Sequence, residues 1–374
     1  MSPEERQRHI DLVRGLSMSG GVLEKDAPTA TINNREWFRS NGSPRPERRA
    51  LHDQLYAEVR AQFPEARQDA RALVLAGPPG AGKGSVAEKV LGAEISQFVN
   101  VDADEFKKLL LREAIADGSY ESAIKPVEVR DMEATGETFY PLELASLVHT
   151  ESSRLAAALR EDLIAEKTNV VVDTVLGDER SADGLADQLT RAGYEVTVID
   201  VEVPYLVSED RIKMRWQEAM AEAEAGKAGA LGGRWVPSTY ARPLFDTEHG
   251  RSKSQDVAAR LAEMCPNVRR YERHFTSLGE HQSSLREGRR AEPVREVEKT
   301  RAEAGAPLVD QAKESSSARS DPLADVRAVI SGSYQRSPKE ATRGAGPGGQ
   351  QPPQARRRGP GYMSDRFPTG GLER

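Results

Sequence analysis

The stretch LVLAGPPGAGKGS, residues 73–85, decides the fold of this chain. Its first residues are apolar without alternation, which is typical of a parallel strand buried on both faces. The three glycines that follow allow backbone conformations in which several N–H groups converge on one phosphate. Lys83 adds a positive charge, and a helix predicted to begin there directs the positive end of its dipole at the ligand. The order strand, loop, helix therefore predicts a site for a nucleoside triphosphate.

The loop departs from the commonest phosphate-binding pattern at one position. That pattern places Ser or Thr directly after the lysine, where the hydroxyl contacts Mg²⁺. Here Gly84 follows the lysine and Ser85 comes next, an arrangement that resembles the loop of adenylate kinases. We predict that Ser85 is the hydroxyl on the metal side, in direct contact or through water. The predicted nucleotide-binding residues are Gly77, Pro78, Pro79, Gly80, Ala81, Gly82, Lys83, Gly84 and Ser85.

Composition narrows the classes of function. The 374 residues suffice for one large α/β domain with extra segments. A net charge of −6 and 5% aromatic residues argue against a nucleic-acid partner. Cys265 is the only cysteine, which excludes an intramolecular disulfide and fits a reducing compartment. Because neither a membrane span of ~20 apolar residues nor an apolar signal core is present, we expect a cytoplasmic protein without a membrane partner. Secretion by a specialised machine would leave no such mark.

Strand and helix signals alternate through the middle of the chain. Strands are predicted at residues 72–76, 97–101, 169–173, 195–201 and 267–271. Helices are predicted at residues 46–63, 141–167 and 181–192. Such alternation with apolar strands predicts a mostly parallel sheet with helices on both faces. With the phosphate loop, this is the α/β fold of P-loop NTPases and kinases, and we expect the first of these helices to pack on the sheet.

Changes in composition divide the chain into three regions. Residues 1–45 are polar, and we expect an irregular segment with only short helical turns between residues 6 and 16. Residues 46–280 carry the strand and helix signals and form the predicted kinase domain. Residues 281–374 are rich in charged residues, Ser, Gly, Pro and Gln, and cannot bury enough apolar surface to offset the entropy of ordering. We predict a disordered tail there, with one short amphipathic helix at residues 321–334.

Two acidic residues follow the second predicted strand in the motif VDADEFK, residues 101–107. The carboxyl end of that strand opens onto the same crevice as the phosphate loop. Asp102 and Asp104 fit two interpretations. Both could cap the following helix, or one could orient a substrate hydroxyl and accept its proton, as kinase carboxylates do.

Arginines after the fourth predicted strand are the candidate partners of a transferring phosphoryl group. In RIKMRW, Arg211 and Arg215 share one helix face, and Arg234 follows in GGRWVP. Taken alone, they would be exposed cations. Beside a phosphate loop they are candidates to stabilise the charge of the transition state.

Six segments in one order carry a resemblance to a known family: GPPGAGKGS, VDADEFK, LVHTESSRL, NVVVDT, VEVPYLVSEDRIKMRW and GRWVP. Over roughly residues 50–275 the chain resembles the zeta toxins, bacterial kinases of toxin–antitoxin systems. These kinases phosphorylate the amino-sugar hydroxyl of UDP-N-acetylglucosamine and so starve cell-wall synthesis. The resemblance implies ATP or GTP and Mg²⁺ as cofactors, a UDP-sugar as the small-molecule substrate, and an antitoxin protein as a partner.

The resemblance also implies roles for individual residues. Lys83 is the loop lysine, Asp104 the catalytic base, and Arg215 and Arg234 are the phosphate-binding arginines. Zeta toxins commonly have an acidic residue, Gly and Thr at the end of the third strand, whereas here the acidic residue is followed directly by Thr. The predicted substrate-binding residues are Asp102, His149, Glu151, Ser152, Asp173 and Thr174.

Two alternatives stand beside this interpretation. A kinase for an antibiotic or a metabolite, resembling chloramphenicol phosphotransferase or adenylate kinase, would use the same chemistry on another hydroxyl. A nucleotide-binding interaction module would transfer no phosphate. Asp104 argues against the module, because a protein that only binds a nucleotide needs no base.

Overall fold

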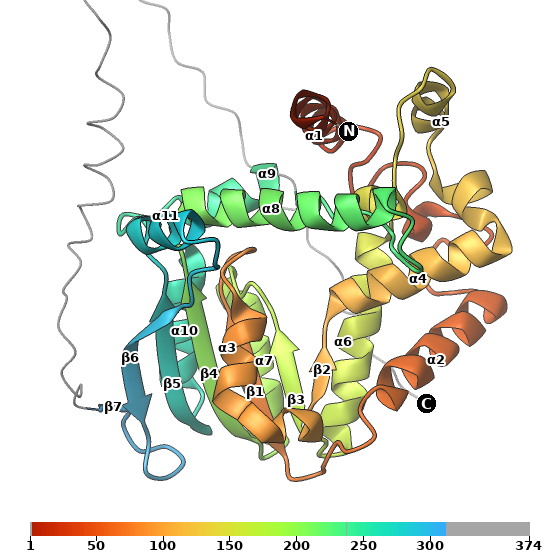
Figure 1. Cartoon of the computed structure of the whole chain (residues 1–374). Helices are drawn as coiled ribbons and strands as arrows, with labels where there is room; N and C mark the ends of the chain where they lie inside the picture. Colours follow the sequence, from red (N-terminus) through yellow and green to blue (C-terminus); the bar gives the residue numbers. More distant parts are fainter. Residues whose placement is uncertain (1, 237, 312–374) are drawn as a thin grey trace, which may run out of the picture. The chain divides into compact units, whose positions relative to one another are not determined.

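The computed structural model describes residues 2–236 and 238–311, and in them one sheet carries the fold (Figure 1). Its order is β2-β3-β1-β4-β5-β6-β7. The five parallel strands are β1 Arg71–Ala76, β2 Val99–Val101, β3 Val170–Asp173, β4 Glu195–Glu202 and β5 Val268–Phe275. Two antiparallel strands, β6 Val294–Thr300 and β7 Val309–Asp310, extend the sheet beyond β5. The predicted, mostly parallel sheet is confirmed.

Strand β1 lies inside the sheet because it has a parallel partner on each edge. Ala72 pairs with Val170 of β3 and with Val196 of β4. Since side chains alternate along a strand, Leu73 faces a core shared with α3 (Lys83–Leu91), and Val74 faces a larger core on the other side. The larger core includes residues of α6 His149–Ala165, α7 Glu179–Arg191 and α10 Lys253–Met264. Helices therefore cover both faces, as predicted.

The other helices surround this frame. They are α1 Pro3–Leu16, α2 Pro46–Ala61, α4 Ala103–Asp117, α5 Val127–Ala134, α8 Tyr205–Glu224, α9 Ser238–Ala241 and α11 Leu278–Arg286. Short turns of tighter or wider helix are η1 Thr31–Asn33, η2 Gly92–Gln97, η3 Tyr120–Ile124, η4 Pro141–Val148 and η5 Arg242–Phe245. The helix predicted at 141–167 is thus divided into η4 and α6. In the described part of the chain, none of the helices is both long and apolar enough to cross a membrane.

The N-terminal region is more regular than the sequence suggested. Helix α1 begins with a capping box in which the Ser2 hydroxyl accepts from the Glu5 N–H and the Glu5 carboxylate accepts from the Ser2 N–H. Such caps satisfy backbone groups that the first helical turn leaves unpaired. Ile10 and Val13 are buried in the core. The expectation of an irregular segment over residues 1–45 is therefore corrected.

Helix α2 packs on α6. Its Leu55 and Val59 are buried, as the four-residue apolar spacing predicted. A buried ion pair joins the two helices, because Arg48 Nε donates to Glu151 Oε1 at 2.6 Å. The spacing therefore identified the buried face of α2.

The region after residue 280 is also more regular than predicted. Helix α11 continues to Arg286, and β6 pairs with β5. Ion pairs help attach this charged strand: Arg251 lies 2.6 Å from Glu296, and Arg270 of β5 lies 3.2 Å from Glu298. Main-chain pairing and ion pairs attach the strand without extensive apolar burial, so the low apolar content was misleading, and the predicted disorder is corrected for 281–311. The helix predicted at 321–334 lies outside the described residues.

Candidate active site

A cavity of about 1220 Å³ lies where the parallel strands end. In sheets of this kind, ligands bind in the crevice beyond the carboxyl ends of the strands. The loop after β1, the residues that follow β2 and β3, and part of α8 line it. Most of the predicted site residues therefore come together: Pro79, Gly80, Ala81, Gly82, Lys83, Gly84, Ser85, Asp102, Asp104, His149, Asp173, Thr174, Arg215 and Arg234.

The phosphate loop depends on glycine where it passes β4. Gly77 has a φ of 136°, and a Cβ there would lie 2.1 Å from the carbonyl oxygen of Val201. No other residue fits that gap. Gly77 and Pro78 shape the loop without lining the cavity. Lys83, the first residue of α3, donates to the Gly77 carbonyl oxygen at 2.9 Å and lies 3.4 Å from Asp173. Its ammonium group thus lies over the loop, beside the end of β3.

Helix α8 holds the loop by its carbonyl groups. The Ser208 hydroxyl donates to the Pro79 carbonyl oxygen at 2.7 Å. Arg211 Nη1 donates to the carbonyl oxygens of Ala81 at 2.9 Å and Gly80 at 3.3 Å. A loop that binds an anion must present its N–H groups to the ligand, and these bonds fix three of its carbonyl groups toward α8. Arg211 is therefore a positioning residue for the loop.

The two acidic residues after β2 lie in the cavity. Asp102 caps α4, because its Oδ1 accepts from the Asp104 N–H at 2.8 Å, and it also lines the cavity. Burial and then the charge of Asp173 raise the pKa of Asp102. Asp104 is paired on both oxygens: Oδ1 lies 2.9 Å from Lys107 Nζ, and Oδ2 contacts Arg234. Asp102 therefore caps the helix, as one of the two interpretations predicted, and it also lines the cavity.

Two glycines bring Arg234 to this carboxylate. A Cβ on Gly232 would lie 2.2 Å from Cβ of Tyr140, and one on Gly233 would lie 2.5 Å from the carbonyl oxygen of Trp216. The GGRW segment can therefore run against α8 closely enough to aim the guanidinium at Asp104. Trp216 is fully buried and donates Nε1–H to Glu143 at 3.3 Å, which fixes the surface on which the segment rests.

Two predicted substrate contacts lie elsewhere. Glu151 is 1% exposed and accepts from Arg48 and His52, at 2.6 and 2.7 Å. Although burial acts to raise the pKa of Glu151, hydrogen bonds from His52 and Arg48 lower it to about 2. The Ser152 hydroxyl donates to the His149 carbonyl oxygen at 2.9 Å. Neither residue lines the cavity, so the expectation that Glu151 and Ser152 contact a substrate is corrected.

His149 and Thr174 do line the cavity. Burial and then the charge of Lys107 lower the pKa of His149 to about 4, so its imidazole is neutral near pH 7. Thr174 continues from β3: its N–H donates to the Leu75 carbonyl oxygen at 3.0 Å, and its hydroxyl accepts from the Leu176 N–H at 3.1 Å.

Sequence reasoning missed Lys107 as a site residue. It lies within VDADEFK, three places after Asp104, and residues at that spacing on a helix are neighbours. The spacing of Lys107 from Asp104 could therefore have identified it. Burial lowers the pKa of Lys107 to about 8. Two further parts of the cavity wall, within residues 17–25 and 285–293, come from segments without a motif, and local patterns could not have found them.

The oxygen donors in the cavity suit Mg²⁺. Asp102, Asp173 and the Ser85 hydroxyl line it, and Mg²⁺ is usually held by one or two carboxylates with water and substrate phosphates. Within the described ranges, no group of three or more His, Cys, Asp or Glu side chains could hold a metal by itself. The donor set therefore fits a metal that arrives with a nucleotide better than a dedicated protein cage.

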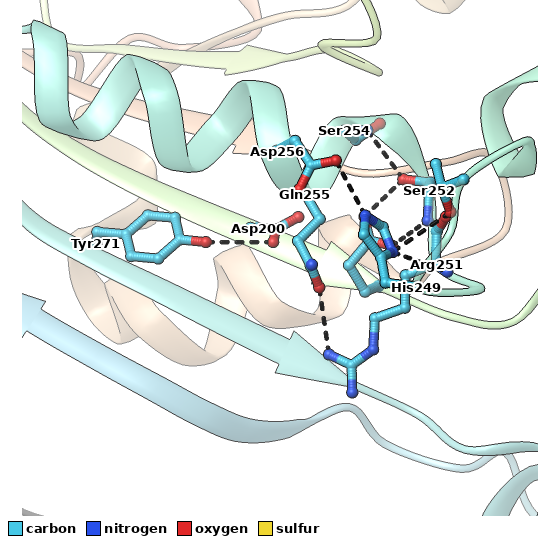
Figure 2. A network of polar contacts seen from close by, with 10 residues as sticks. Asp200, His249, Arg251, Ser252, Ser254, Gln255, Asp256 and Tyr271 are labelled. Atoms are coloured by element: carbon cyan, nitrogen blue, oxygen red, sulfur yellow. Dashed lines mark hydrogen bonds and ion pairs between the residues drawn. The ribbon is translucent and has the colours of Figure 1, made fainter. Parts of the chain in front are cut away.

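A second group of carboxylates, which includes Asp200 (Figure 2), lies at the end of β4 and does not line the cavity. Asp200 and Glu202 are 0% exposed. The Tyr271 hydroxyl donates to Asp200 at 3.4 Å, and Ser252, the N-cap of α10, donates its N–H and hydroxyl to Glu202 at 2.8 and 2.7 Å. Burial raises the pKa of Glu202 to about 7, and burial followed by the charge of Glu202 raises that of Asp200. This group fastens α10 to the sheet.

Comparisons with known proteins place the chain in a family. Residues 54–274 match the family described as Zeta toxin, and no curated protein matches. Similar solved structures include the AvrRxo1-ORF1:-ORF2 complex with ATP, at 20% identity over 81% of this chain and 77% of that chain, with a TM-score of 0.49. Another is the PezAT chromosomal toxin–antitoxin system of Streptococcus pneumoniae, at 14% identity over 60% and 78%, with a TM-score of 0.42. Because the family match spans more than half of the sequence, this chain belongs to the zeta-toxin family.

Proposed function

We propose that this protein is a kinase that transfers the terminal phosphate of ATP or GTP to a hydroxyl of UDP-N-acetylglucosamine and thereby inhibits cell-wall synthesis. One observation carries the kinase assignment: the lysine of a phosphate loop, a carboxylate paired with cations, and two arginines line one cavity. Membership of the zeta-toxin family supports the choice of this acceptor. It also supports the expectation of an antitoxin partner and of action in the cytoplasm, where a nucleotide-sugar precursor would be available.

The loop end of the cavity would hold the donor. Lys83 and the loop N–H groups bind the β- and γ-phosphates, as in other phosphate-loop enzymes. Ser85, Asp102 and Asp173 would hold Mg²⁺, which neutralises charge on the phosphates when bound. The ion pair between Lys83 and Asp173, at 3.4 Å, keeps the lysine at the edge of the loop until a phosphate competes for it.

Asp104 would accept the proton of the acceptor hydroxyl. Its Oδ1 stays paired with Lys107, 2.9 Å away, while the contact of Arg234 with Oδ2 breaks as the arginine turns to the transferring phosphoryl group. The acceptor oxygen then forms its bond to the γ-phosphorus, the bond from that phosphorus to the β–γ bridging oxygen breaks, and ADP or GDP leaves. The hydroxyl proton ends on Asp104. Such a reaction requires positioning and charge stabilisation more than covalent help from the protein.

A mass-spectrometric screen tests this function. The full chain is incubated with ATP or GTP, Mg²⁺ and a panel of UDP-sugars, antibiotics and metabolites, and with Lys83→Ala as the control. We expect a UDP-N-acetylglucosamine product that is heavier by one phosphoryl group, absent with the control. Transfer only to an antibiotic or a metabolite would replace the acceptor, and nucleotide binding without any transfer would favour an interaction module.

A further inference from the structure

A segment beyond the family match crosses the loop end of the cavity. It is the connection between α11 and β6, residues 287–293, which we call the strap. Arg211 joins it to the phosphate loop: Nη1 donates to the Ala81 carbonyl oxygen and Nη2 to the Ala291 carbonyl oxygen, each at 2.9 Å. Pro293 Cγ lies 3.5 Å from the position of a Cβ on Gly82. One guanidinium thus fixes loop and strap together.

The strap is also tied to the helices beside the loop. Arg290 Nη2 donates to Glu218 of α8 at 2.6 Å, and Glu292 lies 3.4 Å from Lys89 of α3. These exposed ion pairs are individually weak. Together with the bond from Arg211 they hold the strap between two helices, and Ala291 is 8% exposed.

The order of strands places the strap opposite the reacting groups. Asp102 and Asp173 follow β2 and β3, on one side of β1, whereas the strap joins α11 to β6 beyond β4 and β5, on the other side (Figure 1). The phosphate loop after β1 lies between them. A triphosphate in the loop whose γ-phosphate meets Asp104 must therefore extend its nucleoside away from the acidic residues, toward the strap.

The lining at this end suits a nucleoside. Leu285 and Pro293 supply apolar surface, and His281 lies beside them in the cavity wall. His281 is 3% exposed; its Nε2 lies 2.7 Å from Asp210, and its Nδ1 has no hydrogen-bond partner among the described residues. The carboxylate of Asp210 fixes the His281 imidazole in this wall.

We propose that the strap and the last turn of α11 form the nucleoside subsite of the donor, and that Arg211 couples this subsite to the phosphate loop. The proposal rests on the proposed function only in taking a nucleoside triphosphate as the donor. It assigns a binding role to residues 281–293, which lie outside the segment that matches the family.

Calorimetric titration of the full chain with ATP and with inorganic tripolyphosphate tests the subsite. Leu285→Ala should weaken ATP binding about five- to tenfold, the scale for losing contact with one apolar side chain. It should leave tripolyphosphate binding unchanged, because that ligand has no nucleoside. The matched control is Val294→Ala: Val294 directly follows the strap, is 56% exposed and does not line the cavity, so both ligands should bind it as they bind wild type.

Two results would overturn the proposal. One is an equal loss of both ligands in Leu285→Ala, which would mean that the residue supports the loop and not the nucleoside. The other needs no variant: wild-type protein that binds tripolyphosphate as tightly as ATP has no nucleoside subsite. These titrations contain no acceptor. A failure of phosphoryl transfer with intact ATP binding would therefore contradict the proposed function and leave the subsite standing.

Discussion

Two groups of carboxylates lie at the carboxyl ends of the parallel strands, in very different surroundings. Asp102 and Asp173, at the ends of β2 and β3, line a cavity together with Lys83. Asp200 and Glu202, at the end of β4, are sealed from solvent. Asp200 accepts a hydrogen bond from Tyr271 (Figure 2), and Glu202 accepts one from Ser252. Position at a strand end is therefore not enough to identify a site.

The difference lies in what faces each group. The cavity group faces a phosphate loop and cations that a negatively charged ligand could recruit, including the guanidinium that contacts Asp104. The buried group faces the cap of α10, and the nearby Arg251 and Arg273 are engaged with Glu296 of β6. We infer that the first group does chemistry and the second holds the fold together. The predictions below test that division.

The largest effect is expected at the loop lysine. Lys83→Ala should lower phosphoryl transfer by about 10³-fold, since it removes the charge that meets the β- and γ-phosphates. Thermal unfolding should stay close to wild type, because the polar partners of the ammonium group among the described residues are the Gly77 carbonyl oxygen and Asp173. Lys227→Ala is the control, because Lys227 follows the end of α8, is exposed and does not line the cavity. Undiminished turnover in Lys83→Ala would remove the loop from catalysis.

A smaller loss is expected at the two arginines. Arg215→Ala and Arg234→Ala should each lower turnover by about 10- to 100-fold and change the nucleotide dissociation constant by about twofold or less. A residue that meets charge only in the transition state contributes little to ground-state binding. Steady-state kinetics and separate binding titrations measure both quantities. Turnover within about a factor of two of wild type would make the arginines ordinary cations.

The buried group should show itself in stability and not in turnover. Raised pKa values mean that the folded state binds protons more tightly than the unfolded state, so stability falls as pH rises from about 4.5 to about 7. The contribution is about 1–3 kcal/mol, given one such buried carboxyl. Asp200→Asn replaces one of the two buried carboxyl groups with an amide. The amide does not titrate, and it can donate a hydrogen bond to Glu202.

The free energy of unfolding, measured by denaturant titration at several pH values, checks this expectation. Relative to wild type, Asp200→Asn should become more stable as pH rises from 5 to 8, where wild type carries the cost of buried charge. A difference that does not change with pH would show that Asp200 and Glu202 do not share a proton in the folded protein.

Local sequence patterns predicted the central strands and the phosphate loop well, and they predicted the contacts between distant segments poorly. The apolar run at Leu73 and the loop that ends at Lys83 depend on neighbouring residues, so strand, loop and helix were readable from the sequence. The place of Asp102 and Asp104 followed from a general property of parallel sheets. Glu151 faces inward because Arg48, more than a hundred positions earlier, pairs with it, and no local pattern contains that contact.

The prediction of disorder for the charged C-terminal segment was wrong for another physical reason. Strand β6 attaches through main-chain pairing with β5 and through ion pairs such as Arg251 with Glu296, whereas low apolar content predicts disorder only when burial is the means of attachment. The strap was also not predicted, because it is linked to the phosphate loop by the Arg211 guanidinium, which donates to carbonyl oxygens of distant residues. Such contacts are set by the tertiary fold alone.

The division between the two carboxylate groups is tested most directly by one comparison of single-turnover phosphoryl transfer. Wild type, Asp104→Asn and Asp200→Asn are assayed side by side, with nucleotide saturating and UDP-N-acetylglucosamine as acceptor. We predict that Asp104→Asn transfers phosphate about 10²-fold or more slowly, the scale of a lost general base, and that Asp200→Asn stays within about twofold of wild type. Equal rates for the two variants, or a greater loss in Asp200→Asn, would contradict the assignment of catalysis to the cavity group.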